Sequence, residues 1–419
     1  MPTDRLYYHD SFLFSFDARV VESLERDGRH AVVLDRTAFY PTSGGQVHDT
    51  GRLVANGREV AVIEVADEED GRIFHFVSEP VSPGAEVHGT IDAARRRDHI
   101  QQHTGQHVLS AAFVRLFDMP TVSFHMGTES CTIDLAAAAV SPEQLREAER
   151  LANEAVLEDR PVAIRFVPLE EARQLGLRKL PPKQAGDLRL INIQDFDLCA
   201  CGGTHVRATG QIGSILVRKT EKVKQGMRVE FVCGMRAVET AARDYAALTR
   251  AAGLLSTHIH DLPDQVLKSL EDARGAAKAQ HKLLEDLAEL QAERMLAATP
   301  GPRRVITAVF PDRDAVFLKL LAQKLTARQQ EVIALLAAGA GQPTLVFAQS
   351  PGHHPSPAKA ADPGTPGLKS NMGQLMKETM AQLGGRGGGS ADMAQGGLPA
   401  GQDTASLEKI LGEAAGKLT

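Results

Sequence analysis

Two short stretches, well separated in the chain, carry the residues around which the fold is expected to organise. They are His103-Thr104-Gly105-Gln106-His107-Val108-Leu109 and Cys201-Gly202-Gly203-Thr204-His205-Val206. His103 and His107 are four residues apart, so a helix would place both imidazoles on one face. In the second stretch, two glycines allow a tight turn that brings the thiolate of Cys201 and the imidazole of His205 together. These four side chains make a Cys/His₃ set, which predicts a tetrahedral zinc site.

The predicted zinc site leaves some alternatives open. Four protein ligands are typical of a closed structural site, whereas a catalytic zinc ion usually keeps one position open. The spacing is not that of a zinc finger, however, and a chain of 419 residues can bury a core without a metal. Cys199 could replace Cys201 as the thiolate ligand. His99, one helical turn before His103, could be a further ligand, a partner of a ligand, or a polar residue at the helix start.

Composition indicates a globular protein outside the membrane. The chain is 43% hydrophobic and has a net charge of −6, and no apolar run approaches the ~18–20 residues of a transmembrane helix. The first residues lack the plan of a signal peptide. Four cysteines do not make a disulfide framework, so a cytoplasmic location is expected. The net charge does not indicate a nucleic-acid partner, but phosphate contacts depend on local basic patches.

An α+β protein of several domains is expected, beginning with a β-rich part over residues 1–93. Short apolar runs at residues 20–21 and 31–34 flank Asp27-Gly28, which is a hairpin signal. Further strands are expected near residues 60–65 and 73–77. The pattern predicts a small β-barrel, with a β-sandwich as the alternative.

Residues 94–240 read as an α+β domain that contains the zinc site. Beyond residue 98 the apolar residues recur at helical spacing: Leu109, Ala112, Phe113 and Leu116. A second helix is expected to begin at Ser141, with Gln144 completing a capping box. The remaining apolar pieces predict strands at residues 163–167, 190–193, 213–217 and 229–232.

The last two parts are a helical linker over residues 241–300 and a small α/β domain over residues 301–419. Residues 262–298 are rich in Ala, Leu, Glu and Lys, which predicts one long helix or an antiparallel helical hairpin. Strands are then expected at residues 305–310, 332–337 and 344–347. A loop dense in Pro and Gly, from Ser350 to Gly367, interrupts this last domain.

The two opening stretches closely resemble the editing domain of alanyl-tRNA synthetase and the freestanding AlaX editing proteins. Segments at residues 209–213 and 226–230 extend this resemblance. Residues 37–46 resemble the family's glycine-rich loop, with Ser43 where a third glycine is common. The glycine-rich segment near residues 384–397 resembles the DHH-associated domain of those synthetases. Nearly the whole chain is covered, with the motifs in the family's order.

The resemblance implies a trans-editing hydrolase that removes serine, and perhaps also glycine, from mischarged tRNA-Ala. Too little sequence precedes residue 39 for a class II aminoacylation domain, so editing without charging is expected. Zinc would activate water, polarise the ester carbonyl or position the substrate. A non-catalytic zinc- and tRNA-binding protein of the same fold is the alternative. A DHH phosphoesterase is disfavoured, because the chain has no Asp-His-His triplet.

The resemblance also suggests substrate contacts, and local charge suggests tRNA contacts. Thr37 is the candidate partner of the serine hydroxyl, Gly44 and Gly45 would allow close approach of the backbone, and Gln46 would orient the substrate. Two local basic patches predict phosphate contacts. Their residues are Arg95, Arg96 and Arg97 before the zinc helix, and Arg218, Lys219, Lys222, Lys224 and Arg228 later in the chain. The C-terminal domain is expected to bind tRNA or to mediate a homodimer.

Overall fold

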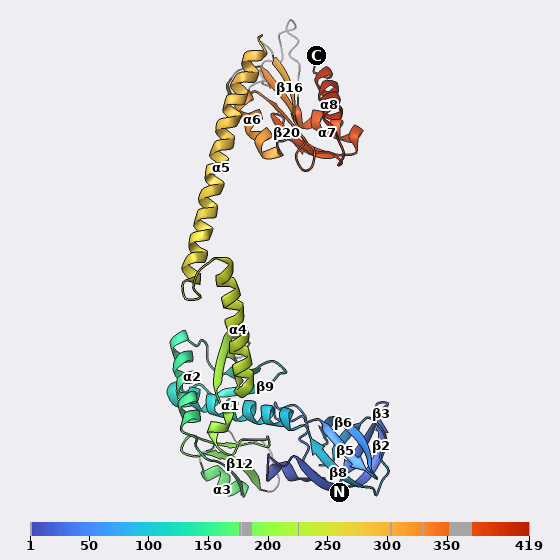
Figure 1. Ribbon diagram of the computed structural model, residues 1–419, viewed down its shortest axis with the longest axis vertical. Coiled ribbons are helices and arrows are strands. Elements are labelled where there is room, and N and C mark those ends of the chain that lie inside the picture. The colour runs from blue at the N-terminus through green and yellow to red at the C-terminus, as the bar shows by residue number, and fades with distance from the viewer. Residues whose placement is uncertain are drawn as a thin grey trace. The chain divides into compact units, whose positions relative to one another are not determined.

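A computed structural model of the chain describes residues 2–175, 177, 187–224, 226–301, 304–328, 331–351 and 371–418. The chain folds as two compact units, Met1–Ala251 and Ala252–Thr419 (Figure 1). Both units mix helices and strands, which confirms the predicted α+β class. The boundaries of the four predicted parts stay a prediction. The predicted loop from Ser350 to Gly367 lies outside the described residues, apart from Ser350 and Pro351.

The first unit begins with a closed six-stranded barrel, so the predicted barrel is confirmed and the sandwich alternative is not. Its strands, in barrel order, are β2 (Ser15–Arg26), β3 (Arg29–Leu34), β7 (Ile73–Val77), β6 (Arg58–Asp67), β5 (Gly51–Ala55) and β8 (Glu86–Ile91). The β2–β3 turn is at Asp27 and Gly28, both with positive φ, as the hairpin signal predicted. Phe16, Ala18 and Val20 alternate with exposed residues along β2 and fill the barrel.

A loop leaves the barrel between β4 (Arg36–Thr37) and β5 and returns to it. A parallel pair of short strands, β1 (Asp4–Arg5) and β4, fixes the start of this loop, and the 3₁₀ helix η1 (Leu6–Tyr8) follows β1. The glycine-rich segment of residues 43–46 lies in this loop. The barrel therefore supplies a rigid base for a loop that reaches towards the rest of the first unit.

Helix α1 (Ala93–Phe117) follows the barrel directly and carries the first pair of predicted ligands. It begins at Asp92, whose carboxylate accepts hydrogen bonds from the backbone N–H groups of Ala94 and Arg95. The helix is buried almost continuously from His99 to Phe113. Its polar residues in that stretch are thus inside the unit, where they need partners.

Two small sheets and three further helices complete the first unit. One sheet has the order β14 (Ile215–Val223), β15 (Gly226–Cys233), β10 (Cys131–Leu135) and β9 (Thr121–Met126). The other has the order β11 (Val162–Val167), β12 (Leu188–Ile193) and β13 (Asp197–Ala200). The helices are α2 (Pro142–Leu157), α3 (Leu169–Gln174) and α4 (Gly234–Leu254), with the 3₁₀ helix η2 (Thr209–Ile212). The predicted capping box of Ser141 and Gln144 opens α2.

The second unit is a mixed sheet covered by helices on both faces. Helix α5 (Leu262–Ala298) is one continuous helix, not a helical hairpin. The sheet has the order β16 (Arg304–Phe310), β17 (Val332–Ala338), β18 (Thr344–Gln349), β20 (Met393–Gly397) and β19 (Arg386–Gly389), with β16 and β17 parallel. The C-terminal part of α5 and α6 (Ala315–Arg328) pack on one face, and α7 (Met372–Leu383) and α8 (Thr404–Gly416) on the other. In the described part of the chain, no helix is both long and apolar enough to span a bilayer.

Candidate metal centre

The four predicted ligands meet inside the first unit. His103 and His107 project from α1, while Cys201 and His205 come from the turn after β13, and their ligand atoms lie within 4.8 Å of one another. The Sγ atom of Cys201 is 3.4 Å from Nε2 of His103 and 3.3 Å from Nε2 of His205. Nitrogen and sulfur donors around a tetrahedral zinc ion would be about 3.6 Å apart. The donor set thus fits one metal ion with little rearrangement.

Gln46 orients the first ligand. Its Nε2 donates to Oγ1 of Thr204 at 2.9 Å, and its Oε1 accepts from the backbone N–H of Thr204 at 3.1 Å. This pair of bonds fixes the orientation of the amide. Oε1 also lies 2.7 Å from Nδ1 of His103, so Nδ1 must carry the proton. The lone pair of His103 is therefore on Nε2, the atom that faces Cys201.

The other two imidazoles are oriented in the same way by different elements. Oγ1 of Thr104 lies 3.3 Å from Nδ1 of His205 and donates its own proton to the carbonyl of Ile100 at 2.8 Å. The hydroxyl can therefore only accept from His205. The Asp197 carboxylate lies 3.2 Å from Nδ1 of His107, which leaves Nε2 as the ligand atom there. Such outer partners fix the tautomer and raise the basicity of metal-binding histidines.

The electrostatics of the cluster favour the ligand forms of its side chains. Burial would raise the pKa of the Cys201 thiol, but the adjacent His103 and His205 outweigh it and hold this pKa well below 9.0. Burial lowers the pKa of His205 to about 3, against the opposing effect of Cys201. A thiolate beside a neutral imidazole is the form that a metal ion requires.

The turn between Cys201 and His205 depends on Gly203 and Arg189. A methyl group on Gly203 would lie 2.1 Å from Cε1 of His103, so only glycine fits there. Arg189, on β12, is buried and donates to the carbonyl groups of Cys201 at 2.6 Å and Gly203 at 3.0 Å. Sequence patterns did not identify Arg189, because its contacts join segments that periodicity does not relate.

The glycine-rich loop docks against β9. Gly44 and Gly45 both have positive φ in a tight turn closed by hydrogen bonds between Ser43 and Gln46. The carbonyl of Gly45 accepts from the N–H of Met126 at 2.9 Å, and a methyl group on Gly45 would lie 2.6 Å from the carbonyl oxygen of Phe124. The close approach that Gly45 permits here is to a strand of the protein itself.

Thr37 lies inside the barrel. Its side chain is 0% exposed, and its Oγ1 lies 2.8 Å from Nε2 of His75 and accepts from the N–H of Phe39. Contact of this hydroxyl with a substrate would require the pair with His75 to open. The predicted role of Thr37 in serine recognition stays a prediction.

The three arginines at the start of α1 have different surroundings. Arg96 is 0% exposed, pairs with the Asp49 carboxylate and also donates to the carbonyls of Ser11 and Ala38. A phosphate contact by Arg96 would require this buried ion pair to break. The predicted role of Arg96 in tRNA binding stays a prediction. Arg95 is half-buried and Arg97 is exposed.

The second basic patch lies on the β14–β15 hairpin, and most of its charges are paired. Arg218 pairs with Asp244, Lys219 with Glu230 at 3.3 Å, and Arg228 with both Asp134 at 2.7 Å and Glu221 at 3.6 Å. Lys222 and Lys224 are exposed, and no carboxylate among the described residues pairs with either. These two lysines are therefore the residues of the patch whose charge no carboxylate among the described residues neutralises.

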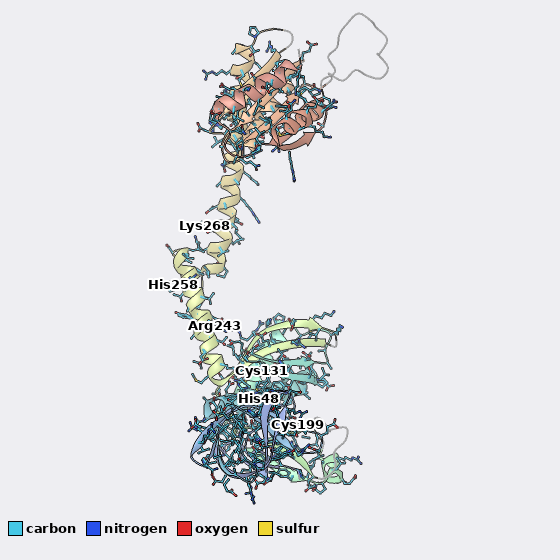
Figure 2. All side chains as sticks on the ribbon, turned by 90° about the vertical axis from the view of Figure 1, so that its right-hand side faces the viewer. His48, Cys131, Cys199, Arg243, His258 and Lys268 are labelled. Carbon is cyan, nitrogen blue, oxygen red and sulfur yellow. The ribbon has the colours of Figure 1, made fainter. Side chains whose placement is uncertain are left out.

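The remaining cysteines lie outside the cluster. Two of them, Cys131 and Cys199, are labelled in the first unit in Figure 2. Among the described residues, Cys201 and not Cys199 belongs to the group of side chains that could hold a metal ion. Cys199 is buried in β13 and contacts the carbonyl of Ala200 at 3.6 Å. Cys131 and Cys233 are buried thiols, as predicted, and burial raises the pKa of Cys131 to about 12. His99 is also outside the cluster and is 2% exposed.

Two family models match the chain. The model described as tRNA synthetases class II (A) matches residues 4–95, and that of the threonyl and alanyl tRNA synthetase second additional domain matches residues 188–229. The first range includes the barrel, and the second includes the turn with Cys201 and His205.

Several curated proteins are similar to this chain. It is 31% identical to the alanyl-tRNA editing protein AlaX-L of Pyrococcus horikoshii, over 94% of each chain. It is 38% identical to the alanine–tRNA ligase of Pyrococcus furiosus over 69% of this chain, and 33% identical to that of Pyrococcus abyssi over 94%. The chain spans only 32% and 42% of the lengths of these two ligases. The crystal structure of the C-Ala domain from Aquifex aeolicus alanyl-tRNA synthetase matches 27% of this chain and 92% of its own, at 26% identity and a TM-score of 0.21.

Proposed function

The chain belongs to the alanyl-tRNA editing family, and from this premise we propose that it is a zinc-dependent deacylase of mischarged tRNA-Ala. The observation that carries the proposal is the buried Cys/His₃ cluster, in which each imidazole is oriented through Nδ1 by a different partner. Similarity to an AlaX-L editing protein over 94% of each chain supports editing as the activity.

Zinc is the metal that this donor set favours. Three imidazoles and one thiolate are borderline-soft ligands, which suit zinc better than magnesium, calcium or manganese. When bound, zinc would supply Lewis-acid chemistry at the ester carbonyl or would fix the position of the substrate. Four protein ligands favour the second role. The protein's own contribution is to hold His103 through Gln46 and to shield the cluster from solvent.

Serine is the proposed amino acid, with glycine as a second substrate. A charging site that selects alanine rejects only weakly an analogue with an added hydroxyl or one methyl group fewer, so hydrolysis after charging is needed. The loop with Gly44 and Gly45 contacts the metal centre through Gln46 and would form one wall of the amino-acid pocket. Gln46 would act on the substrate indirectly, through His103.

The proposed partner is tRNA-Ala, which this protein would meet in the cytoplasm. Lys222 and Lys224 at the tip of the β14–β15 hairpin, and Arg95 at the start of α1, are the basic residues most available for phosphate. The paired residues Arg218, Lys219 and Arg228 would contribute less, because a carboxylate already neutralises each of them. We propose that the second unit binds the tRNA body or forms a homodimer.

A deacylation assay tests the proposal. The full chain loaded with zinc is expected to hydrolyse Ser-tRNA-Ala, and more slowly Gly-tRNA-Ala, while leaving Ala-tRNA-Ala intact. The variant His205→Ala should lose both zinc and hydrolysis, whereas His30→Ala, at an exposed histidine of β3, should keep both. Zinc binding and tRNA binding without hydrolysis of the seryl ester would instead favour the non-catalytic alternative.

A further inference from the structure

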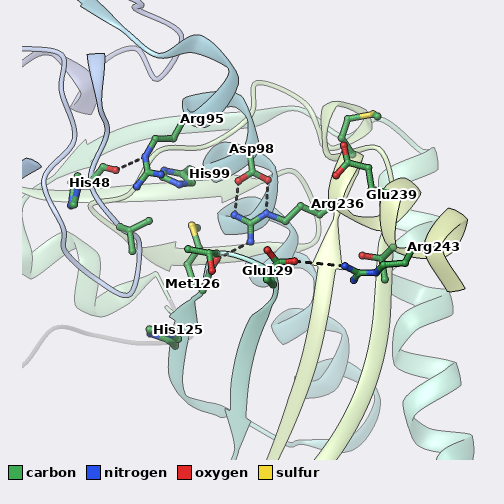
Figure 3. A pocket seen from close by; sticks show the side chains of 15 residues that line it. His48, Arg95, Asp98, His99, His125, Met126, Glu129, Arg236, Glu239 and Arg243 are labelled. Carbon is green, nitrogen blue, oxygen red and sulfur yellow. Dashed lines mark hydrogen bonds and ion pairs between the residues drawn. The ribbon is translucent and has the colours of Figure 1, made fainter. Parts of the chain in front are cut away.

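A pocket of about 950 Å³ lies beside the metal centre in the first unit (Figure 3). Four segments line it: residues 47–48 of the glycine-rich loop, the first turns of α1, residues 125–129 at the β9–β10 turn, and the first turns of α4. None of the metal ligands lines it. The pocket is thus next to the metal centre, but its lining residues are not metal ligands.

Two contacts join this pocket to the metal centre. The ring of His103 packs against Phe124 of β9, with the ring centroids 5.4 Å apart. Two residues further along β9, the N–H of Met126 donates to the carbonyl of Gly45. Both segments then continue into the wall of the pocket, through Met126 on the strand and Val47 on the loop. The glycine-rich loop and β9 therefore border both the metal centre and the pocket.

The charges at the α4 end of the pocket are already paired. Arg236 binds both carboxylate oxygens of Asp98, at 2.8 and 2.5 Å, and also donates to the carbonyl of Gly127 at 2.8 Å. Arg243 lies 3.8 Å from the carboxylate of Glu129. This end has little positive charge to offer a ligand.

Arg95, at the opposite end, is not neutralised. Its Nε donates to the carbonyl of His48 at 3.0 Å, which holds the guanidinium beside the pocket (Figure 3). Among the residues that the structure describes, no carboxylate forms an ion pair with it. The two terminal nitrogens of Arg95 thus offer a planar fork of N–H groups, which matches the oxygens of a phosphate.

His99 adds a second unmet polar group to the same end. It lines the pocket and is 2% exposed, and its Nδ1 has no hydrogen-bond partner in the described part of the chain. A buried polar atom without a partner is destabilising, so such an atom in a pocket wall points to a ligand. Arg95 lies one helical turn before His99, so both can act on one group.

We propose that this end of the pocket binds the phosphodiester that precedes the terminal nucleoside of the tRNA acceptor strand. Arg95 would pair with the phosphate, and His99 would hydrogen-bond to the same nucleotide. On α1, Arg95 lies eight residues before His103, a rise of about 12 Å. A nucleoside with its 3′ ester at the metal centre would cover part of this distance, and the long side chain of Arg95 would cover the rest to reach its 5′ phosphate. The inference rests on the proposed function.

A binding experiment with an unreactive RNA tests the inference without requiring hydrolysis. The probes are the trinucleotide CCA, adenosine and inorganic phosphate, each titrated against the zinc-loaded full chain. Arg95→Gln is expected to weaken CCA binding by about tenfold or more, because a charge-assisted hydrogen bond is lost. Arg95→Lys keeps the charge but loses the planar fork of N–H groups, so its affinity for CCA should lie between those of wild type and Arg95→Gln. Adenosine should bind all variants alike.

The matched control is Arg52→Gln, because it removes the same charge from β5 of the barrel, outside the pocket. Arg52 is exposed, does not line the pocket, and lies 3.5 Å from the carboxylate of Glu59. Its CCA affinity should stay within about twofold of wild type. Equal CCA binding by wild type and Arg95→Gln would overturn the inference. Inorganic phosphate that binds as tightly as CCA would also overturn it, because the site would then take a free anion.

Kinetics on Ser-tRNA-Ala provide the second test. Arg95→Gln should raise KM by about tenfold and leave kcat within about twofold, since the phosphate contact exists before and during reaction. A fall in kcat with unchanged KM would contradict the inference. If the wild-type chain hydrolyses no seryl ester but CCA binding still depends on Arg95, the proposed function fails while the phosphate site stands.

Discussion

Replacing Gln46 with leucine is expected to weaken the metal centre without removing a ligand. Leucine is close in size but cannot accept the hydrogen bonds from Nδ1 of His103 and the N–H of Thr204. Both donors are buried, and each unsatisfied one costs about 1–3 kcal/mol. Loss of such an outer partner typically lowers metal affinity by about 10–100-fold. Glutamate at this position keeps the acceptor, so Gln46→Glu should retain most of the affinity.

The assay is a competition for zinc between the full chain and a chromophoric chelator. Thermal unfolding of the metal-free proteins, followed by circular dichroism, separates lost affinity from lost folding. Ser43→Ala is the control, because that exposed side chain lies in the same loop and its hydroxyl makes no hydrogen bond in the described structure. If Gln46→Leu binds zinc as tightly as wild type, Gln46 does not orient His103 and our reading of the site is wrong.

Three further predictions concern other parts of the first unit. Gly203→Ala should displace His103, because the new methyl group would lie 2.1 Å from its ring. The zinc content of this variant after dialysis should fall to background. A full zinc content would show that the metal centre tolerates the methyl group. Burial lowers the pKa of His75 to about 4, so the unfolded chain binds more protons between pH 6.5 and 4. The free energy of unfolding, measured with urea, should be highest above about pH 6.5 and should fall by about 3 kcal/mol towards pH 4. If the dependence of this free energy on pH is unchanged in His75→Phe, His75 is not its source. Replacing both Lys222 and Lys224 with glutamine should make the slope of log K for tRNA binding against log salt concentration shallower by about 1.4–1.8. An unchanged slope would mean that neither lysine contacts tRNA phosphate.

The metal ligands could be identified from the sequence because their spacing is a local property. Helical periodicity relates His103 to His107, and a glycine turn relates Cys201 to His205. The structure brings the two pairs together. Sequence alone left Cys199 as an alternative, because two cysteines of one strand and turn are equivalent until the turn is built.

The hydrogen-bond partners of the three histidines could not be predicted from the sequence, since each partner lies on a different element from its histidine. Gln46 lies 158 residues before its partner Thr204, and no periodicity connects them. We predicted that Gln46 orients the substrate, whereas in the structure it contacts His103. Asp197 and Thr104 carry no motif of their own. Asp197 lies within the range that the second family model matches, and Thr104 lies between the two histidines of α1; these positions are the signal that a sequence search could have used.

The fold shows the same division between local and long-range information. Alternation, capping and composition predicted four barrel strands, β2, β3, β6 and β7, as well as α2 with its cap and the long helix α5. They did not predict the barrel strands β5 and β8. The strands β19 and β20 were not predicted, because glycine is disfavoured in strands. At Gly387 glycine is required, because a methyl group there would lie 2.8 Å from both Cα of Gly396 on β20 and Cγ of Met380 on α7. Close packing of a helix on a sheet, invisible in the sequence, overrides local preference.

The most direct test of the account is a titration of the metal-free full chain with zinc, during which hydrolysis of Ser-tRNA-Ala is measured. Activity is expected to rise from background and level off at one zinc ion per chain, with no rise in His205→Ala at any zinc concentration. Full hydrolysis by the metal-free protein, or by His205→Ala, would contradict the claim that the cluster of His103, His107, Cys201 and His205 is the editing centre.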